Sequence, residues 1–286
     1  MLNKNLIKKF NDQGYIIIKN LVGKREIKKI YSQMNTTLNT ILDYNKIKFS
    51  KNLSLDKKYF LLKRKIPVLK SHFYDSIRIM DALNNVIYSP KIVSKIKKLL
   101  NTKTVFITNH RLRTDSKIEK ANLAMHQELN NISTESALVF CPFVEVSKKI
   151  GGLCVIPKSH IHGHIEYNNT KVPAEKRDNG FINKILKGKD KKNYKNEIIK
   201  NLFDKDKLVF PHLYPGDAVI FKSMLFHGST NYKKNGLRWT LIANYHKVNK
   251  TPYILKKDFK PDKIYKTELG MPMRIPYNVN YNKIFK

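Results

Sequence analysis

The sequence predicts a mainly β domain of the sandwich, jelly-roll or barrel type, preceded by a helical region. The first hundred residues carry apolar side chains at helical spacing, whereas short apolar or β-branched runs separated by Gly and Pro begin at Thr104. Hydrophobic residues make up 41% of the 286 residues, which is enough for a buried core. Many short strands with such turn signals are typical of an all-β core, and this length fits a single domain.

The N-terminal part, residues 1–103, is expected to be mainly helical. Gly14 is placed to end the first helix as its C-cap, and the β-branched run Tyr15–Ile18 after it predicts a strand. The stretch 44–70 has a mixed pattern and gives no clear prediction. The apolar spacing predicts helices over residues 2–10, 24–42, 76–86 and 90–100, the last with Pro in its first turn.

The β core is expected over residues 104–248, within one domain that covers 1–286. Residues 166–207 are rich in Lys and Asn and weakly periodic, so we expect an insertion over one end of the core, of the kind that often forms lids or binding loops. Residues 249–286 are expected to be a tail on the surface. The predicted strands are 105–108, 137–143, 153–156, 218–221 and 239–245.

The chain is strongly basic, with 56 Lys and Arg against 22 Asp and Glu, which gives a formal charge of +34. Only eight of these basic residues are arginines, the residue that base readout and bidentate phosphate contacts favour. The lysines are scattered along the chain together with Asn, Ile and Tyr, so A/T-rich codon usage is a competing explanation for their number. A charge of this size still biases encounters towards anions, which favours an anionic partner.

Several classes of protein do not fit the composition. Two cysteines, Cys141 and Cys154, cannot form a disulfide framework and have no zinc-binding spacing, so we expect them in the core. No apolar run approaches the length of a membrane-spanning helix, and the first residues do not resemble a signal peptide. The expected location is therefore cytoplasmic.

Two histidines and a glutamate carry the strongest chemical signal. In an extended segment residues i and i+2 project to the same side, so His126 and Glu128 present an imidazole and a carboxylate together. His227, at the end of an apolar strand that follows the turn at residues 215–217, is the best candidate for a third ligand. Two histidines and a carboxylate leave three adjacent positions open on iron(II), which suits a bidentate 2-oxo acid and O2.

An arginine follows this set at a suggestive distance. Arg238 lies 11 residues after His227, and in a strand it shares a face with Thr240. A guanidinium aimed inward beside a metal can grip the far end of a dicarboxylate bidentately. By contrast, His160, His162 and His164 alternate but have no carboxylate placed to help them, and the histidines at 110, 212 and 246 fit ordinary polar or core roles better than ligation.

Taken in order, these motifs make the sequence resemble the phytanoyl-CoA dioxygenase-like branch of the iron(II)/2-oxoglutarate-dependent oxygenases. The resemblance covers nearly the whole chain. It departs from the usual pattern at Glu128, where Asp is commoner, at Phe140, where Trp is usual, and at Lys158, where Gly is usual. The similar segments are the helix–Gly–Tyr–strand opening at residues 10–18, MHQE at 125–128, FCPF at 140–143, GGL at 151–153, IPKSH at 156–160, PGD at 215–217, HGS at 227–229 and RWT at 238–240.

The resemblance implies a double-stranded β-helix, a jelly-roll or cupin-like core, with the N-terminal helical region packed outside it. It also implies iron(II), 2-oxoglutarate and O2 as cofactors, with hydroxylation of a small-molecule substrate and release of succinate and CO2. His126, Glu128 and His227 would bind the iron. The implied contacts to 2-oxoglutarate come from Arg238, Thr240, Phe140 and a polar residue before the metal motif, Arg113 or Asn109.

Two other kinds of function stay open at this stage. A β-fold binding protein without catalysis would bind neither metal nor 2-oxoglutarate productively. A nucleic-acid-associated protein would use the positive charge and show steep salt dependence of binding. No motif identifies the substrate.

Overall fold

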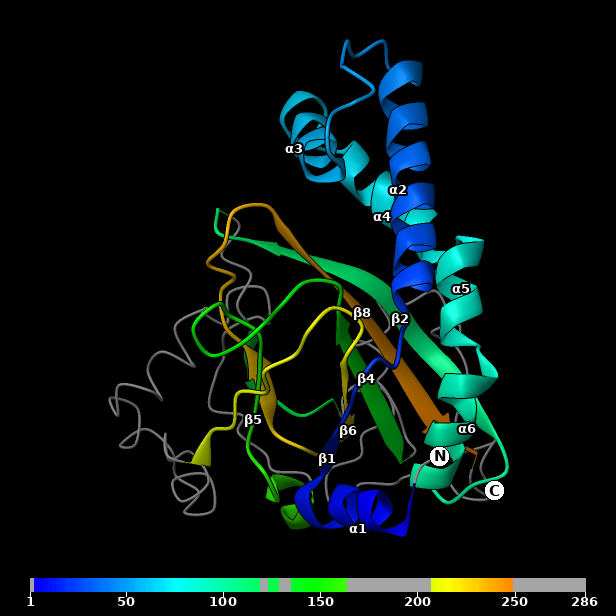
Figure 1. The fold of residues 1–286 in the computed structure, drawn as a ribbon, viewed down its shortest axis with the longest axis vertical. Coiled ribbons are helices and arrows are strands. Elements are labelled where there is room, and N and C mark those ends of the chain that lie inside the picture. Colours follow the sequence, from blue (N-terminus) through cyan, green and yellow to red (C-terminus); the bar gives the residue numbers. More distant parts are fainter. Residues whose placement is uncertain (1–2, 119–122, 129–134, 164–206, 249–286) are drawn as a thin grey trace, which may run out of the picture.

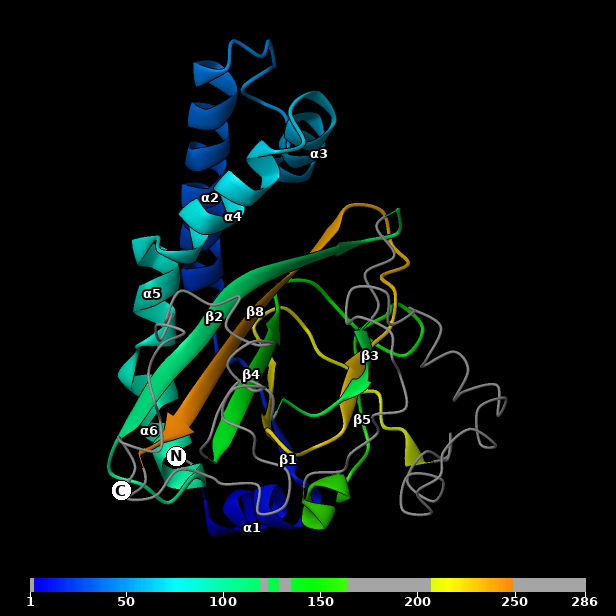
Figure 2. The same ribbon diagram turned by 180° about the vertical axis from the view of Figure 1, so that it is seen from behind.

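Two antiparallel sheets face each other, and most of the described helices pack against the larger one. The computed structural model describes residues 3–118, 123–128, 135–163 and 207–248. The larger sheet has the strand order β1-β6-β4-β8-β2 and the smaller one the order β3-β7-β5 (Figures 1 and 2). The strands are β1 (Tyr15–Ile18), β2 (Val105–Ser116), β3 (Leu123–His126), β4 (Ser136–Pro142), β5 (Leu153–Val155), β6 (Ala218–Lys222), β7 (His227–Ser229) and β8 (Leu237–Lys247).

The helices form a layer against the larger sheet, and α2 and α3 extend beyond its edge (Figure 1). None of the described helices combines the length and apolar character that a bilayer crossing requires. The expected tail and all but the last residue of the expected insertion lie outside the described residues. The helices are α1 (Lys4–Gln13), α2 (Lys24–Tyr44), α3 (Leu55–Lys65), α4 (Leu69–Arg78), α5 (Asp81–Ile87) and α6 (Pro90–Leu99), with a short 3₁₀ helix at Ser159–His162.

The helix predicted over residues 76–86 is wrong as a single element. The backbone of Met80 is extended and separates α4 from α5, and the amide of Ala82 in the new first turn donates to the side chain of Gln33 at 2.9 Å. The stretch 44–70, which gave no clear prediction, contains α3. Its N-cap is Ser54, whose hydroxyl accepts from the amide of Lys57.

The core on the outer face of the larger sheet joins the sheet to the helices. Trp239 of β8 packs edge-to-face on Tyr59 of α3, with 5.6 Å between ring centroids, and on Phe73 of α4 at 6.2 Å. Its indole Nε1 donates to Asp56 at 3.2 Å, and the other carboxylate oxygen of Asp56 accepts from the amide of Leu237. Burial of these large aromatic surfaces is the main stabilising contribution at this junction.

A second apolar cluster fills the space between the two sheets. It includes Phe140 of β4, Phe221 of β6 and Val155 of β5, so its members come from both sheets. We call the side of the larger sheet that faces this cluster its inner face. The facing antiparallel sheets and the helices outside them agree with the predicted jelly-roll architecture, although the sheets do not close into a continuous barrel.

Gly14 ends α1 as predicted, with φ of 80° and its amide bonded to the carbonyl of Phe10 at 2.9 Å. A Cβ at this position would lie 2.4 Å from Nδ1 of His160 and 2.6 Å from a methyl group of Leu225. The absence of a side chain therefore lets the start of β1 approach the 3₁₀ helix closely. Nε2 of His160 donates to the carbonyl of Asn11 at 2.8 Å, which ties the 3₁₀ helix to α1.

Candidate metal centre

The three residues of the predicted ligand set meet at one point. His126 ends β3 and lies directly opposite His227 of β7 in the strand register, with ring centroids 4.3 Å apart. Glu128 lies just after β3, where its amide donates to the carbonyl of Ser223 at 2.9 Å. One ligand atom from each residue lies within 4.8 Å of the other two. Among the described residues, these three are the His, Cys, Asp or Glu side chains that lie close enough together to hold a metal ion.

Local backbone irregularity explains how the set forms. The pairing of β3 with β7 shifts register between Leu123 and His126, and such bulges re-aim side chains near the end of a strand. Glu128 therefore reaches His126 from a turn, and not from the continuous strand that the sequence suggested. Its Oε1 lies 3.3 Å from Nε2 of His126 and 3.7 Å from Nε2 of His227. Between the two ligands, Gln127 donates to the carbonyls of Gly163 and Met224, which holds the turn in place.

Hydrogen bonding and burial prepare these groups for a cation. Nδ1 of His227 lies 3.0 Å from the carbonyl oxygen of Leu225, and donation there leaves Nε2 with its lone pair towards Glu128. Burial and the neighbouring His126 ring lower the pKa of His227, which favours the neutral imidazole that binds metals. Burial alone would raise the pKa of Glu128, but the adjacent imidazoles of His126 and His227 outweigh it and hold the pKa well below its usual range.

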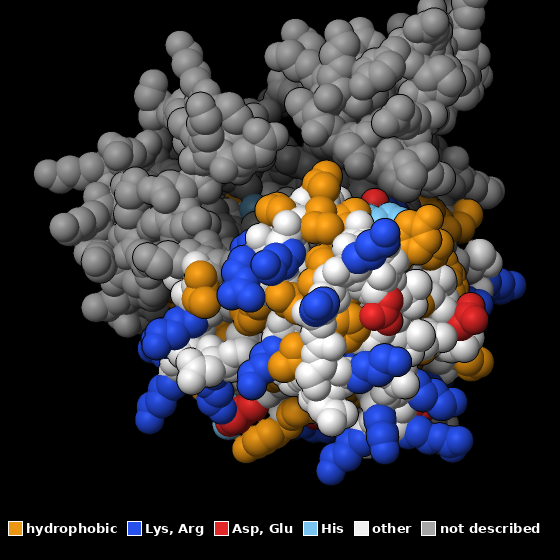
Figure 3. All heavy atoms as spheres, turned by 90° about the horizontal axis from the view of Figure 1, so that it is seen from above, with side chains coloured by type: hydrophobic (Ala, Val, Ile, Leu, Met, Phe, Trp, Pro, Cys, Tyr) orange, Lys and Arg blue, Asp and Glu red, His pale blue; other side chains and the backbone are white. Residues whose placement is uncertain are grey.

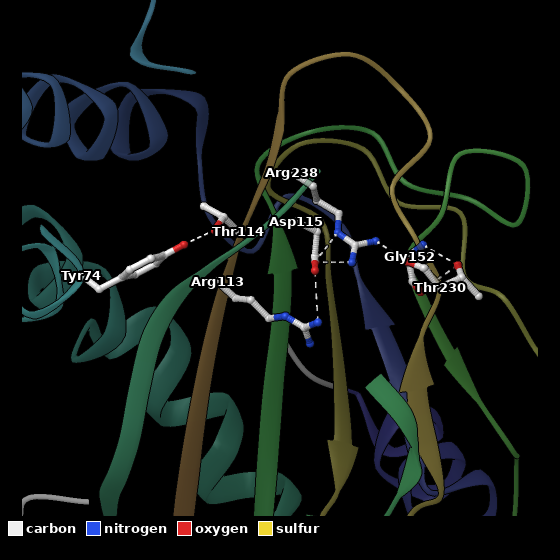
Figure 4. A network of polar contacts seen from close by, with 7 residues as sticks. All are labelled: Tyr74, Arg113, Thr114, Asp115, Gly152, Thr230 and Arg238. Carbon is white, nitrogen blue, oxygen red and sulfur yellow. Dashed lines mark hydrogen bonds and ion pairs between the residues drawn. The ribbon is translucent and has the colours of Figure 1, made fainter. Parts of the chain in front are cut away.

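A cluster of polar side chains lies on the inner face where β2 pairs with β8. Arg238 is fully buried and pairs with Asp115 through Nε, at 3.0 Å, and through Nη2. Its Nη1 donates to the backbone carbonyl of Thr230 at 3.3 Å, and Thr230 directly follows β7, the strand of His227 (Figure 4). Arg113 contacts the other oxygen of Asp115 at 3.1 Å.

Thr240 and Phe140 also face inward. Thr240 is 1% exposed and its hydroxyl has no hydrogen-bond partner among the described atoms, an arrangement that native proteins avoid unless a ligand completes it. Phe140 lies opposite Ile242 in the register of β4 and β8 and belongs to the apolar cluster between the sheets. The side chain of Asn109 lies outside what the structure describes.

Several other sequence expectations have clear outcomes. His160 and His162 lie in a 3₁₀ helix and not on an extended segment, and His164 lies outside the described residues. His212 is paired with Glu145 on the surface, and His246 packs on Phe106. Both cysteines are buried, as predicted, and burial raises the pKa of the Cys154 thiol to about 12.

The sequence reasoning missed Asp115. It lies outside the segments in which the sequence resembles the family pattern. A usable signal was present, because Arg111, Arg113 and Asp115 alternate with Leu112 and Thr114, the period of a half-buried strand.

The donor set suits iron(II) on chemical grounds. Two imidazole nitrogens and one carboxylate are the ligands of facial iron sites, and an arginine with a partnerless hydroxyl beside it suits a dicarboxylate cosubstrate. The residues present therefore fit the cofactors that the resemblance implies.

Several solved structures have the same fold as this chain. The non-heme α-ketoglutarate-dependent epimerase SnoN from nogalamycin biosynthesis has a TM-score of 0.55 and 12% sequence identity, over 85% of this chain and 80% of that chain. EctD from S. alaskensis has a TM-score of 0.55 and 14% identity, over 90% and 82%. HygX from Streptomyces hygroscopicus, solved with nickel and 2-oxoglutarate bound, has a TM-score of 0.53 and 11% identity, over 88% and 90%. The predicted fold class is thereby confirmed.

At the level of sequence, no curated protein matches the chain significantly. The sequence model of phytanoyl-CoA dioxygenase (PhyH) matches residues 10–238. This match runs from Phe10 in α1 to Arg238 near the start of β8 and includes β1 to β7 and all three residues of the candidate metal centre. The chain therefore belongs to the phytanoyl-CoA dioxygenase family.

Proposed function

We propose that this protein is an iron(II)- and 2-oxoglutarate-dependent dioxygenase that hydroxylates a small, anionic molecule and releases succinate and CO2. The observation that carries the proposal is the convergence of His126, Glu128 and His227 from separate parts of the chain. Membership of the family confirms the resemblance seen in the sequence, and iron(II), 2-oxoglutarate and O2 are the cofactors of that family.

In this proposal the metal, once bound, supplies the activation of O2 that protein side chains cannot perform. His126, Glu128 and His227 hold it on one side and leave the opposite positions to exchangeable ligands. Arg238 and Thr240 bind the distal carboxylate of 2-oxoglutarate from the inner face of β8, and Arg113 adds a second positive charge. Phe140 lines the cosubstrate site.

Apolar side chains around the centre would limit the access of water. The ring of Phe221 packs against His227 with centroids 4.4 Å apart, and Leu225 and Phe140 belong to the same apolar cluster. Such a shell strengthens the electrostatic interactions inside it and reduces side reactions with water.

The class of substrate is inferred from charge. The chain carries a formal charge of +34. Burial lowers the pKa of Arg113, and repulsion from Arg238 and from Arg111 adds to this effect against the opposing charge of Asp115. A phosphorylated or carboxylated small molecule would be attracted to this region.

The test is binding of iron(II) and 2-oxoglutarate under anaerobic conditions, followed as the weak visible charge-transfer band and then as succinate formation after O2 is admitted. Wild-type protein is expected to show both signals and His126→Ala neither. His212→Ala is the matched control, because this histidine is 50% exposed in its side chain and pairs with Glu145 away from the candidate centre. A wild-type protein without the band, indistinguishable from His126→Ala, would disprove the proposal.

The positive charge also favours a second candidate, a nucleic-acid-associated protein. The face in Figure 3 argues against it, because the Lys and Arg side chains there are dispersed among hydrophobic and uncharged ones and do not form a continuous patch. Retention on DNA or RNA at about 150 mM salt, with a steep fall at higher salt, would support this alternative. Absence of retention would contradict the nucleic-acid alternative.

A further inference from the structure

A buried aspartate lies between two arginines on the inner face of the larger sheet. Asp115 is 1% exposed and lies opposite Arg238 in the register of β2 and β8, while Arg113 lies opposite Thr240. Because residues i and i+2 of a strand share a face, Arg113 and Asp115 point to the same side as Arg238 and Thr240. Figure 4 shows both guanidinium groups turned towards the Asp115 carboxylate.

The contacts of Arg238 leave one edge of its guanidinium available. The group has five N–H donors. Nε and Nη2 donate to the same oxygen of Asp115, and Nη1 donates to the carbonyl of Thr230. One N–H on each terminal nitrogen remains, and together these two form the edge that binds a carboxylate bidentately.

The two oxygens of Asp115 serve different arginines. Oδ2 accepts from Arg238, and Oδ1 accepts from Arg113 at 3.1 Å. One carboxylate therefore holds both guanidinium groups beside each other on the inner face of the larger sheet.

We propose that Asp115 is a positioning residue that acts through Arg238 and Arg113 and orients their guanidinium groups towards the distal carboxylate of 2-oxoglutarate. It holds Arg238 by the side edge of the guanidinium and so leaves the end edge for the cosubstrate. It also keeps Arg113 turned towards the same point. This inference rests on the proposed function and adds the residue that orients its carboxylate-binding groups.

The test variant is Asp115→Asn, which has nearly the same shape but one acceptor oxygen in place of two. One arginine must then face an amide N–H, so the two guanidinium groups can no longer both be held. Binding of 2-oxoglutarate and of 2-oxopentanoate, which has a methyl group where 2-oxoglutarate has its distal carboxylate, is measured by anaerobic titration calorimetry on Mn(II)-loaded protein. Mn(II) accepts the same nitrogen and carboxylate ligands.

For Asp115→Asn we expect about a tenfold loss of 2-oxoglutarate affinity, the size of one charge-assisted hydrogen bond, and no change for 2-oxopentanoate. A merely structural role would lower the affinity for both ligands equally and would overturn the proposal, as would an unchanged or increased affinity for 2-oxoglutarate.

Asp217→Asn is the matched control, because this carboxylate is also buried and paired, with Lys19 at 2.8 Å, but lies at the turn before β6. It should leave the preference for 2-oxoglutarate intact.

Arg113→Gln covers the case in which Asp115→Asn does not fold. Its side chain is 15% exposed and its removal leaves the pair of Asp115 with Arg238 in place. A selective loss of about threefold in 2-oxoglutarate affinity, from one weakened charge contact, is expected, and no loss would overturn the proposal. If wild-type protein does not distinguish the two ligands, the proposed function fails with it. If wild type distinguishes them and both variants do so equally well, only the role of Asp115 fails.

Discussion

The two faces of β8 in the larger sheet differ in their chemistry. On β8 the outward positions Trp239, Leu241, Ala243 and Tyr245 are apolar or aromatic and belong to the core shared with the helices. Four of the inward positions, Arg238, Thr240, Asn244 and His246, are equally buried but polar, and the fifth, Ile242, packs on the apolar cluster between the sheets. The four outward and the four polar positions all lie below 3% exposure, so burial alone does not tell a structural position from a functional one.

The alternation of side chains along a strand explains this division. Successive residues project to opposite faces, so one strand can join the helices on one side and hold polar groups on the other. Apolar burial on the outer face stabilises the fold, whereas polar burial on the inner face costs free energy unless a partner or a ligand satisfies each group. Substitutions at neighbouring positions of β8 should therefore separate stability from ligand binding.

The largest expected effect on stability is at the outer face. Trp239→Ala removes the ring that contacts Tyr59 and Phe73 and leaves a cavity where β8 meets the helices, so we expect a loss of about 3–5 kcal/mol in the free energy of unfolding. Urea unfolding followed by circular dichroism measures it. Tyr214→Ala, at a residue that is 55% exposed, should change stability by less than about 0.5 kcal/mol. A small effect of Trp239→Ala would contradict the assignment of the outer face as the main junction.

Sequence reasoning found most elements whose hydrophobic pattern was regular. The helices α2 and α6 and the strands β1 and β6 lie close to their predicted bounds, because their apolar residues keep a clear period. The strand predicted at 105–108 extends to Ser116. The prediction was too short because Arg111, Arg113 and Asp115 occupy inner-face positions where a core strand would have apolar residues. A strand with charged residues on its inner face does not have the pattern of an ordinary core strand.

The same reasoning limits what could be predicted of the site. His126, Glu128 and His227 were recognisable because their spacing and order carry the chemistry, and the structure brings them together. The pairing of Arg238 with Asp115 was not recognisable, because it depends on the register of β2 against β8. Strand register depends on which residues of two distant segments lie opposite each other, and the pattern within either segment does not show this.

A smaller effect is expected at the outer side of β2. Thr114 lies between Arg113 and Asp115 but points to the helices, where its hydroxyl contacts the hydroxyl of Tyr74 on α4 (Figure 4). Tyr74→Phe removes this contact and should lower the free energy of unfolding by about 1 kcal/mol. The affinity of the metal-loaded protein for 2-oxoglutarate should stay within about twofold of wild type, well under the tenfold that 1.4 kcal/mol represents. A selective loss of affinity would show that the helical layer controls the inner face and would contradict the division proposed above.

The smallest effect on stability is expected at Thr240, one residue from Trp239. Its buried hydroxyl has no partner within the described part of the chain, so Thr240→Val removes an unsatisfied polar group and keeps the shape of the side chain. The free energy of unfolding should stay within about 0.5 kcal/mol of wild type or rise slightly. If the hydroxyl serves the distal carboxylate of 2-oxoglutarate, calorimetry should nevertheless show an affinity about five- to tenfold lower, the value of one hydrogen bond. Unchanged affinity together with unchanged stability would remove Thr240 from the proposed carboxylate-binding groups and leave Arg238, held by Asp115, as their centre.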